Sequence, residues 1–286
     1  MDYVFFVLTI VCVWAMLSLS ANLVLGYTGL FTIGHVGYLA AGAYIAAILN
    51  ILLGLNYYLT IPVAIVGTAI FALLTLLPLL RLGPFHFGLA TLGLNVVIVE
   101  VIHNTAPRSA GAEGLFGLKL PPPINGAPGQ FAVCLAALAA CAFLAWWIVS
   151  SPFGRSLRGI RDDAGALASL GKDPDRYRIA IWTVSGGIAG LAGALYTTTL
   201  FYIDPTVFVV TFSFFLLVYI GVGGLASIVG SILGPLILIL FNESLRFTGL
   251  PSDFSGPVQQ MLYGLLLVLL MLFRRQGLLG KYEFHD

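Results

Sequence analysis

Residues 3–25 read YVFFVLTIVCVWAMLSLSANLVL and contain no acidic or basic side chain. A helix that crosses the hydrocarbon core of a bilayer needs about 20 predominantly apolar residues, and this stretch provides them. A secretory signal peptide would place basic residues before a shorter apolar core, whereas this chain begins Met-Asp-Tyr. We therefore expect residues 3–25 to form a membrane-spanning helix that is retained.

The same apolar pattern recurs along the whole chain. Its 286 residues are 59% hydrophobic and 9% charged, with a net charge of +1 and a mean hydropathy of +1.02. A soluble domain of this length could not bury so much apolar surface. The candidate spans are 3–25, 28–53, 60–80, 84–104, 131–149, 178–200, 208–225, 229–247 and 258–273. The expected fold is an all-α integral membrane protein, a polytopic helix bundle of about eight transmembrane helices in one domain, residues 1–286.

Glycines interrupt the second apolar segment. The stretch GYTGLFTIGHVGYLAAGAY (26–44) places His35 among five glycines. Glycine weakens a helix, so the segment predicts a broken or re-entrant element that faces protein or a water-filled path. The alternative is close helix packing through Gly37 and Ala41. Both interpretations remain open, and His35 is either a pathway residue or a hydrogen-bonded packing histidine.

Small residues recur at every fourth position in two later segments. They are Gly186, Gly190 and Ala194 in the first segment, and Ala226, Gly230 and Gly234 in the second. Such positions allow helices to approach closely in a membrane, and so predict a tightly packed bundle. The cysteines Cys12, Cys134 and Cys141 lie in apolar runs and are interpreted as packing residues rather than a disulfide framework.

Basic residues predict the orientation of the chain. Short loops rich in Lys and Arg stay in the cytoplasm, and the 150–178 segment carries six such residues. We therefore expect 150–178 to be a cytoplasmic loop, with Arg81, Arg274, Arg275 and Lys281 on the same side. The C-terminus is then cytoplasmic and 105–130 is an external loop. Residue Asp2 also lies outside if 28–53 crosses the membrane once.

The cytoplasmic loop contains a short apolar stretch between charges. Asp162 and Asp163 precede AGALASL, and Gly171 follows it, so a helix over 162–171 would have acids at its N-terminal end and a glycine at its C-terminal cap. Its face would carry Ala164, Leu167 and Ala168. Such an element is typical of a docking site for a soluble partner. The alternative is a solvated loop whose arginines, Arg155, Arg158 and Arg161, only fix the topology.

These stretches together resemble a known family. SPFGRSLRGIRDDAGALASLGKDPDRYR (151–178) is similar to the cytoplasmic loop of ABC-transporter permeases, in which a coupling helix contacts the ATPase subunit. NLVLGYTGLFTIGHVGYLAAGAY (22–44), FHFGLATLGL (85–94), SAGAEGL (109–115), GGIAGLAGALY (186–196), GGLASIVGSILGP (223–235) and MLFRRQGLLG (271–280) follow the order of motifs in the M-type permease of the branched-chain amino-acid uptake system.

The chain departs from that pattern at several positions. Thr32 stands where the family usually has Ser, Tyr38 where it has Phe, Ala110 where it has Gly, and Arg275 where it has Pro. Asn95 and Val96 replace a Phe followed by an acid or amide, which puts in doubt any pore role of that polar position.

The resemblance implies a transport function. The chain would be the permease subunit of an ABC importer for branched-chain or related neutral amino acids, forming half of the translocation pathway. Its partners would be an H-type permease, two cytoplasmic ATPase subunits that hold ATP-Mg, and an external substrate-binding protein. The implied location is the bacterial or archaeal cytoplasmic membrane, with many crossings. The implied ATPase contacts are Asp162, Asp163, Ala164, Leu167, Ala168 and Gly171.

Other chemistry finds little support in the sequence. It contains no Gly-x-x-x-x-Gly-Lys-Ser/Thr phosphate loop, so we expect no ATP site, no cofactor and no enzymatic activity in this chain. The histidines are scattered without metal-ligand spacing, so we expect no metal site. Glu100 and His103 lie near the outer end of a span, where they either pair or take part in transport. The candidate pathway residues are His35, Gly37, Asn95 and Glu100.

Rival functions remain open. The nearest is an ABC permease for urea or short amides. A second is an ion-coupled secondary transporter, which would need ion sites at broken helices and no ATPase-docking element. A membrane-embedded enzyme would need convergent catalytic groups.

Overall fold

The computed structural model describes residues 2–104, 115–118, 120–122, 124, 126–200, 202–246, 261, 264–265 and 277–280. Within these residues the chain forms nine α-helices, one short 3-10 helix and one two-stranded ribbon. The α-helices are α1 (Asp2–Thr28), α2 (His35–Ile51), α3 (Tyr57–Leu79), α4 (Pro84–Asn104), α5 (Ala127–Ser150), α6 (Pro152–Ser169), α7 (Pro174–Leu200), α8 (Val210–Gly223) and α9 (Ile228–Arg246). The 3-10 helix η1 spans Pro205–Phe208, and strand β1 (Leu115–Phe116) pairs antiparallel with β2 (Tyr202–Ile203).

The expectation of an all-α polytopic membrane protein is confirmed. In the described part of the chain, five helices are long and apolar enough to cross a membrane, namely α1, α3, α4, α5 and α7, and α8 with α9 can form a sixth, bent span. Helix α2 is apolar but has only 17 residues. Apart from Met261, Gly264 and Leu265, the span expected at 258–273 lies outside the described residues.

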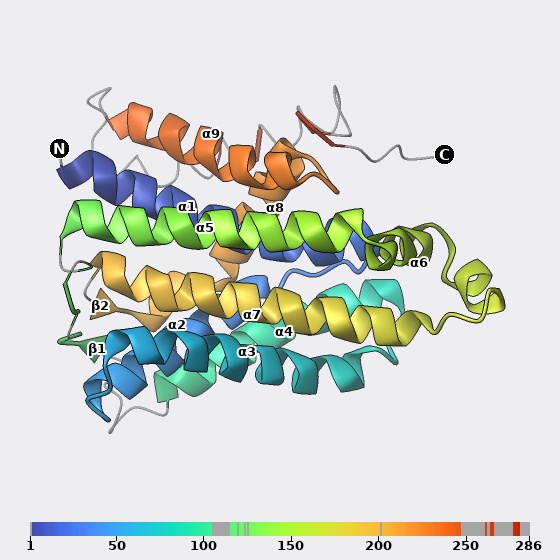
Figure 1. Ribbon diagram of the computed structural model, residues 1–286, viewed down its shortest axis with the longest axis horizontal. Helices are drawn as coiled ribbons and strands as arrows, with labels where there is room; N and C mark the ends of the chain where they lie inside the picture. The colour runs from blue at the N-terminus through green and yellow to red at the C-terminus, as the bar shows by residue number, and fades with distance from the viewer. Residues whose placement is uncertain are drawn as a thin grey trace.

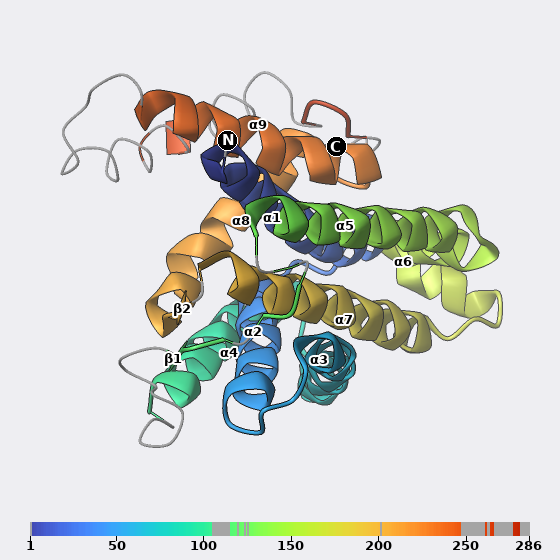
Figure 2. The ribbon, with the colours of Figure 1, turned by 60° about the vertical axis from the view of Figure 1, so that its left-hand side comes forward.

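Helices α1 and α7 form the centre of the bundle. Each is 72% buried along its most apolar window, against 22% to 28% for α3, α4 and α5. Helix α7 packs against α1, α2 and α3, while α1 also packs against α5 and α9. Figure 1 shows α9 on one side of the α1, α5 and α7 layer and α3 on the other, and Figure 2 shows the same order from another direction. The outer helices thus present apolar side chains to their surroundings.

Small residues set the distances between the central helices, as the fourfold repeats predicted. A Cβ atom added to Gly190 of α7 would lie 2.6 Å from Cβ of Thr68 in α3. One added to Gly193 would lie 2.7 Å from the backbone nitrogen of Ala43 in α2. On the other flank, Gly223 and Gly230 bring α8 and α9 into backbone contact. Larger side chains at these positions would force the helices apart.

The chain is broken between α1 and α2. Helix α1 ends at Thr28, residues 29–34 are not helical, and α2 begins at His35. Gly29 has φ +72°, a conformation that glycine adopts without steric cost. Gly37 and Gly42 of α2 also make close contacts with α4 and α7. The glycine-rich segment therefore contains both a break and close helix packing, at different glycines.

A second break, between α8 and α9, was not predicted. The sequence suggested two separate spans at 208–225 and 229–247, but the two helices meet at residues 224–227 with a bend of 118°. Helix α8 has 14 residues and is about 21 Å long, which is shorter than the hydrocarbon core of about 30 Å. We call residues 224–227 the elbow.

The two ends of the bundle differ in character. Helix α6 and the connection between α3 and α4 lie at one end, and the β1–β2 ribbon lies at the other (Figure 1). The connection of α3 to α4 contains Arg81, and the α6 end contains the six basic residues of the 150–178 segment. These basic residues therefore gather at a single end, while Arg274, Arg275 and Lys281 lie outside the described residues.

Candidate functional site

The helix α6 consists of two helical pieces joined at Asp163. This residue is non-helical, with φ −157° and ψ 106°. Its Oδ1 atom accepts hydrogen bonds from the backbone N–H groups of Gly165 at 2.8 Å and Ala166 at 3.0 Å. This is the geometry of a helix N-cap, which satisfies backbone donors that the first turn leaves unpaired. A separate short helix, residues 164–169, therefore begins at Asp163.

The end of the short helix is equally well defined. The N–H of Gly171 donates to the carbonyl of Ala168 at 2.9 Å, and Gly171 has φ +79°. Glycine in this conformation commonly ends a helix. The two acids expected at the start differ in role: Asp163 caps the helix, whereas the Asp162 carboxylate lies 3.5 Å from the Arg161 guanidinium.

The surface of the short helix differs from the expected docking face. Leu167 is only 7% exposed, and a Cβ added to Gly159 would lie 3.3 Å from its Cδ1 atom. Ala164 is half-buried, whereas Ala168 is exposed and Leu170 is 77% exposed. The chain folds back at Asp163, so Leu167 packs against the first piece of α6. The expected face of Ala164, Leu167 and Ala168 is thus corrected: Leu167 points inward, and Ala168 and Leu170 are accessible.

One arginine connects this loop to the bundle. The Nη1 atom of Arg161 donates to the carbonyl of Gly26 in the last turn of α1 at 2.6 Å. The Arg161 side chain is 15% exposed and passes along Gly29. A cation near a helix C-terminus is favourable because the last carbonyls lack partners within the helix. Arg161 therefore does more than fix the topology, since it holds the loop against the end of α1.

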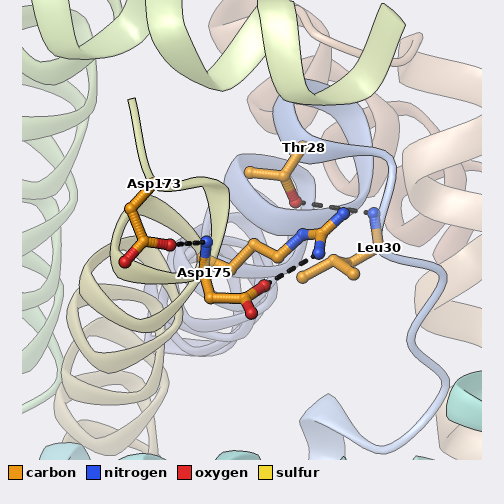
Figure 3. Close-up of polar contacts among 5 residues, drawn as sticks. Thr28, Leu30, Asp173 and Asp175 are labelled. Carbon is orange, nitrogen blue, oxygen red and sulfur yellow. Dashed lines mark hydrogen bonds and ion pairs between the residues drawn. The ribbon is translucent and has the colours of Figure 1, made fainter. Parts of the chain in front are cut away.

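The start of α7 meets α1 at the same place. Figure 3 shows Asp173 and Asp175 beside Thr28, the last residue of α1, and Leu30, which lies two residues beyond it. The Asp173 carboxylate accepts from the N–H of Asp175 at 3.1 Å, and Asp175 accepts from the Arg178 guanidinium at 3.0 Å. Both contacts lie at the start of α7, and an exposed ion pair such as that of Asp175 with Arg178 contributes little stability.

A polar cluster lies deep among α1, α2 and α7. His35 is 1% exposed, and its Nε2 atom lies 2.7 Å from Oγ of Ser185. Its Nδ1 atom lies 3.3 Å from Oγ1 of Thr32. Ser185 in turn donates to the carbonyl of Ser20 at 2.8 Å. Both ring nitrogens of His35 thus have partners within the bundle, and the cluster joins the start of α2 to the two central helices.

Gly37 and Asn95 meet at the junction of α2, α4 and α8. A Cβ added to Gly37 would lie 3.1 Å from Oδ1 of Asn95. The Nδ2 atom of Asn95 donates to Oγ of Ser213 in α8 at 3.2 Å. The Oδ1 atom of Asn95 is buried, and within the described part of the chain it has no hydrogen-bond partner. A buried acceptor without a partner is costly, so this oxygen is an unsatisfied acceptor at a three-helix contact.

Glu100, the fourth candidate pathway residue, is exposed, whereas the other three are buried. Glu100 is exposed on α4, and its Oε2 atom accepts from Nδ2 of Asn104 at 3.0 Å. It pairs there with Asn104 rather than with His103. Among the residues that the structure describes, no group of three or more His, Cys, Asp or Glu side chains could hold a metal ion.

An apolar groove of about 640 Å³ opens between α2, α3 and α4. Tyr44, Phe71, Thr75 and Ile98 are among its lining residues. Because its walls are almost entirely apolar, the groove offers no set of polar groups that would orient a zwitterionic solute.

Sequence reasoning missed Asn22, which contacts the elbow. Its Oδ1 atom accepts from the N–H of Ala226 at 3.1 Å. Its Nδ2 atom lies 3.3 Å from the carbonyl of Gly224, 3.2 Å from that of Ser227 and 2.6 Å from Oγ of Ser231. The available signal was an amide side chain within an otherwise apolar span.

Comparison with known proteins identifies a family whose model this chain matches. The family model described as "Branched-chain amino acid transport system / permease component" matches residues 3–271. The chain is 29% identical to the high-affinity branched-chain amino acid transport system permease protein LivM of Escherichia coli (strain K12), over 95% of this chain and 68% of that protein. No solved structure matches.

Two archaeal proteins are also similar. The probable branched-chain amino acid transport permease protein LivM of Methanocaldococcus jannaschii is 23% identical, over 92% of this chain and 89% of that protein. The probable LivH permease protein of the same organism is 26% identical, over 90% of this chain and 84% of that protein.

Proposed function

Since the chain belongs to the family of permease components of the branched-chain amino acid transport system, we propose that it forms half of the translocation pathway of an ABC importer. The proposed cargo is a branched-chain or related neutral amino acid, as the names of the LivM relatives suggest. The membrane would be the cytoplasmic membrane of a bacterium or archaeon, which the chain crosses several times.

The observation that carries this proposal is the short helix 164–169. It is capped by Asp163, ended by Gly171 and held to α1 through Arg161. Ala168 of this helix and Leu170 directly after it are exposed, and they form a small apolar surface at the charged end of the bundle. A rigid, exposed element with an apolar tip suits a cleft in a soluble protein better than it suits solvent. We assign this surface to one of two ATPase subunits, which bind ATP-Mg.

The proposed orientation follows from the same end of the molecule. The 150–178 segment and the α3–α4 connection would lie in the cytoplasm because they carry the basic residues. The external binding protein would then approach the opposite end, which carries the β1–β2 ribbon and the external loop 105–130. The C-terminus would be cytoplasmic.

An exposed face of α4 would meet the second, H-type permease. Gly93 lies on this face, where an added Cβ would meet no atom of another described segment within 4 Å, and Glu100 lies two turns later on the same face. A charged side chain is costly against lipid, and a glycine allows another helix to approach closely. The pathway would pass this face, with Gly37 and Asn95 just behind it and His35 at the start of α2.

A matched pair of substitutions tests the function. Leu170→Glu places a charge on the proposed docking surface, whereas Leu53→Glu alters a leucine that is 65% exposed at the opposite end of the bundle. We expect Leu170→Glu, like Ala168→Glu, to insert normally but to abolish uptake of radiolabelled leucine and substrate-stimulated ATP hydrolysis by the reconstituted importer. Leu53→Glu should retain both activities.

Two results would contradict the proposal. Wild-type uptake of leucine, isoleucine and valine that stays at background in the complete reconstituted importer would refute the cargo, and uptake of urea or acetamide would then identify the rival. Normal ATP-coupled uptake by Leu170→Glu and Ala168→Glu would refute the docking role.

A further inference from the structure

The elbow between α8 and α9 holds a strained backbone. Ala226 has φ +56° and Gly224 has φ +112°, and a positive φ is uncommon for any residue other than glycine. Such conformations persist only where the surrounding structure enforces them. Backbone groups at a break in a membrane protein must also find partners within the protein. The elbow therefore depends on residues from other parts of the chain.

Two distant segments supply those partners. From one direction, Asn22 of α1 bonds the N–H of Ala226 and lies within reach of the carbonyls of Gly224 and Ser227. From another, the N–H groups of Leu278 and Leu279 donate to the carbonyls of Val222 at 2.9 Å and Gly223 at 3.1 Å. The first helix thus bonds the elbow itself, and the C-terminal segment bonds the last two residues of α8 directly before it.

Asn22 lies one turn before the residue that Arg161 contacts. It is 1% exposed, and Gly26 follows it by four residues on the same face of α1. A Cβ added to Gly26 would lie 2.5 Å from the backbone nitrogen of Ala226, so this turn of α1 touches the elbow directly. The carbonyl of Gly26 accepts from Arg161. A continuous set of contacts therefore runs from the 150–178 loop through Gly26 and Asn22 to the elbow.

We propose that Asn22 is a positioning residue through which movement of the 150–178 loop reaches the elbow. When the loop shifts, Arg161 pulls on the last turn of α1, and the Asn22 amide moves the backbone of residues 224–227 with it. Helix α8 then changes its contact with Asn95, because Ser213 of α8 is the partner of that amide. The role of Asn22 in transport rests on the proposed function, but the contacts from Arg161 to the elbow do not depend on that function.

The test is a double-mutant cycle read at the elbow. Leu225 is half-buried there. It is replaced by cysteine in a chain whose native residues Cys12, Cys134 and Cys141 are changed to alanine, and its labelling by N-ethylmaleimide is timed in membranes containing the full transporter. We expect Asn22→Leu to raise the labelling rate about tenfold, the effect of losing a buried hydrogen bond on an opening equilibrium.

The decisive comparison concerns Arg161. Arg161→Ala should also raise the labelling rate at Leu225→Cys when Asn22 is present, and should have no further effect in the Asn22→Leu background. Arg158→Ala is the matched control, since the Arg158 guanidinium donates to the carbonyl of Val149 in α5, whereas that of Arg161 donates to Gly26. Ser20→Ala is the control for a buried polar residue of α1, since Ser20 bonds to Ser185 and not to the elbow.

Three outcomes would overturn the proposal: Arg161→Ala acting equally in both backgrounds, Ser20→Ala acting as strongly as Asn22→Leu, or Asn22→Leu leaving the rate unchanged. If Asn22→Leu does not accumulate, Ser231→Ala replaces it, because that change removes the shortest contact of the Asn22 amide. Labelling needs neither substrate nor ATP. A wild-type protein without leucine uptake would therefore contradict the proposed function, but the labelling rates at Leu225→Cys could still be measured and compared.

Discussion

Gly193 lies where α7 packs directly against the backbone of α2. A Cβ added there would meet backbone atoms of Leu39 and Ala43, and a backbone contact cannot be relieved by a change of rotamer. At Gly93 of α4, by contrast, an added Cβ would meet no neighbouring atom within 4 Å among the residues that the structure describes. Two glycines that look alike in the sequence therefore have opposite tolerance for a side chain.

We predict that Gly193→Ala destabilises the chain. Overpacking costs about 1–3 kcal/mol, which exceeds the gain of about 1 kcal/mol that alanine brings to a helix. Gly93→Ala should receive that gain without the cost. The measurement is thermal unfolding of the detergent-solubilised protein, which should show a lowered Tm for Gly193→Ala and an unchanged or raised Tm for Gly93→Ala. Equal Tm values for the two variants would contradict the packing account.

At the residue scale the sequence predicted types of contact but not partners. The spacing of Gly186, Gly190 and Ala194 indicated a closely packed helix, and the structure confirms it. That Gly190 meets Thr68 follows only from the arrangement of three helices. The partners of Asn22 could not be predicted for the same reason, since they lie more than 200 residues away in the chain.

At the scale of elements, a helix could be predicted from the sequence where its own residues define its start and its end. The acids, the apolar stretch and Gly171 predicted a short helix after Arg161, and the structure has one at 164–169. Which face it exposes was not predictable, because the inward position of Leu167 depends on the fold-back at Asp163. The elbow was missed because the apolar runs on either side of it resemble two ordinary spans.

We predict that the short helix depends on the Asp163 cap. Asp163→Ala should speed amide hydrogen exchange of residues 165–169 about fivefold, since loss of an N-cap costs about 1 kcal/mol. Asp163→Asn retains a capping oxygen and should behave like wild type. Asp162→Ala is the control, because Asp162 lies beside Arg161 and caps nothing. Faster exchange in Asp162→Ala than in Asp163→Ala would show that the helix begins elsewhere.

At the scale of the whole molecule, the order and class of the helices followed from hydropathy. Eight of the nine expected apolar segments correspond to described helices, α1 to α5 and α7 to α9. The sequence could not show that α1 and α7 form the centre, because the outer helices are just as apolar. In a membrane, apolar side chains face lipid as readily as protein, so hydropathy alone does not separate the two.

The end of the molecule that carries the basic residues also carries the accessible surface of the short helix. Ala168 and Leu170 lie there, whereas Leu167, between them and Gly159, is covered by the chain itself. We propose that a cytoplasmic ATPase binds this surface and does not contact Leu167. The three positions therefore provide an internal comparison within four consecutive residues.

The most direct measurement is cross-linking of single cysteines at these positions to the ATPase in assembled membranes. Each of Ala168→Cys, Leu170→Cys and Leu167→Cys is placed in the chain without its native cysteines and treated with a short bifunctional maleimide. We expect cross-linked ATPase with Ala168→Cys and Leu170→Cys and almost none with Leu167→Cys. Absence of cross-linked ATPase at all three positions, or equal yield at Leu167→Cys, would contradict it.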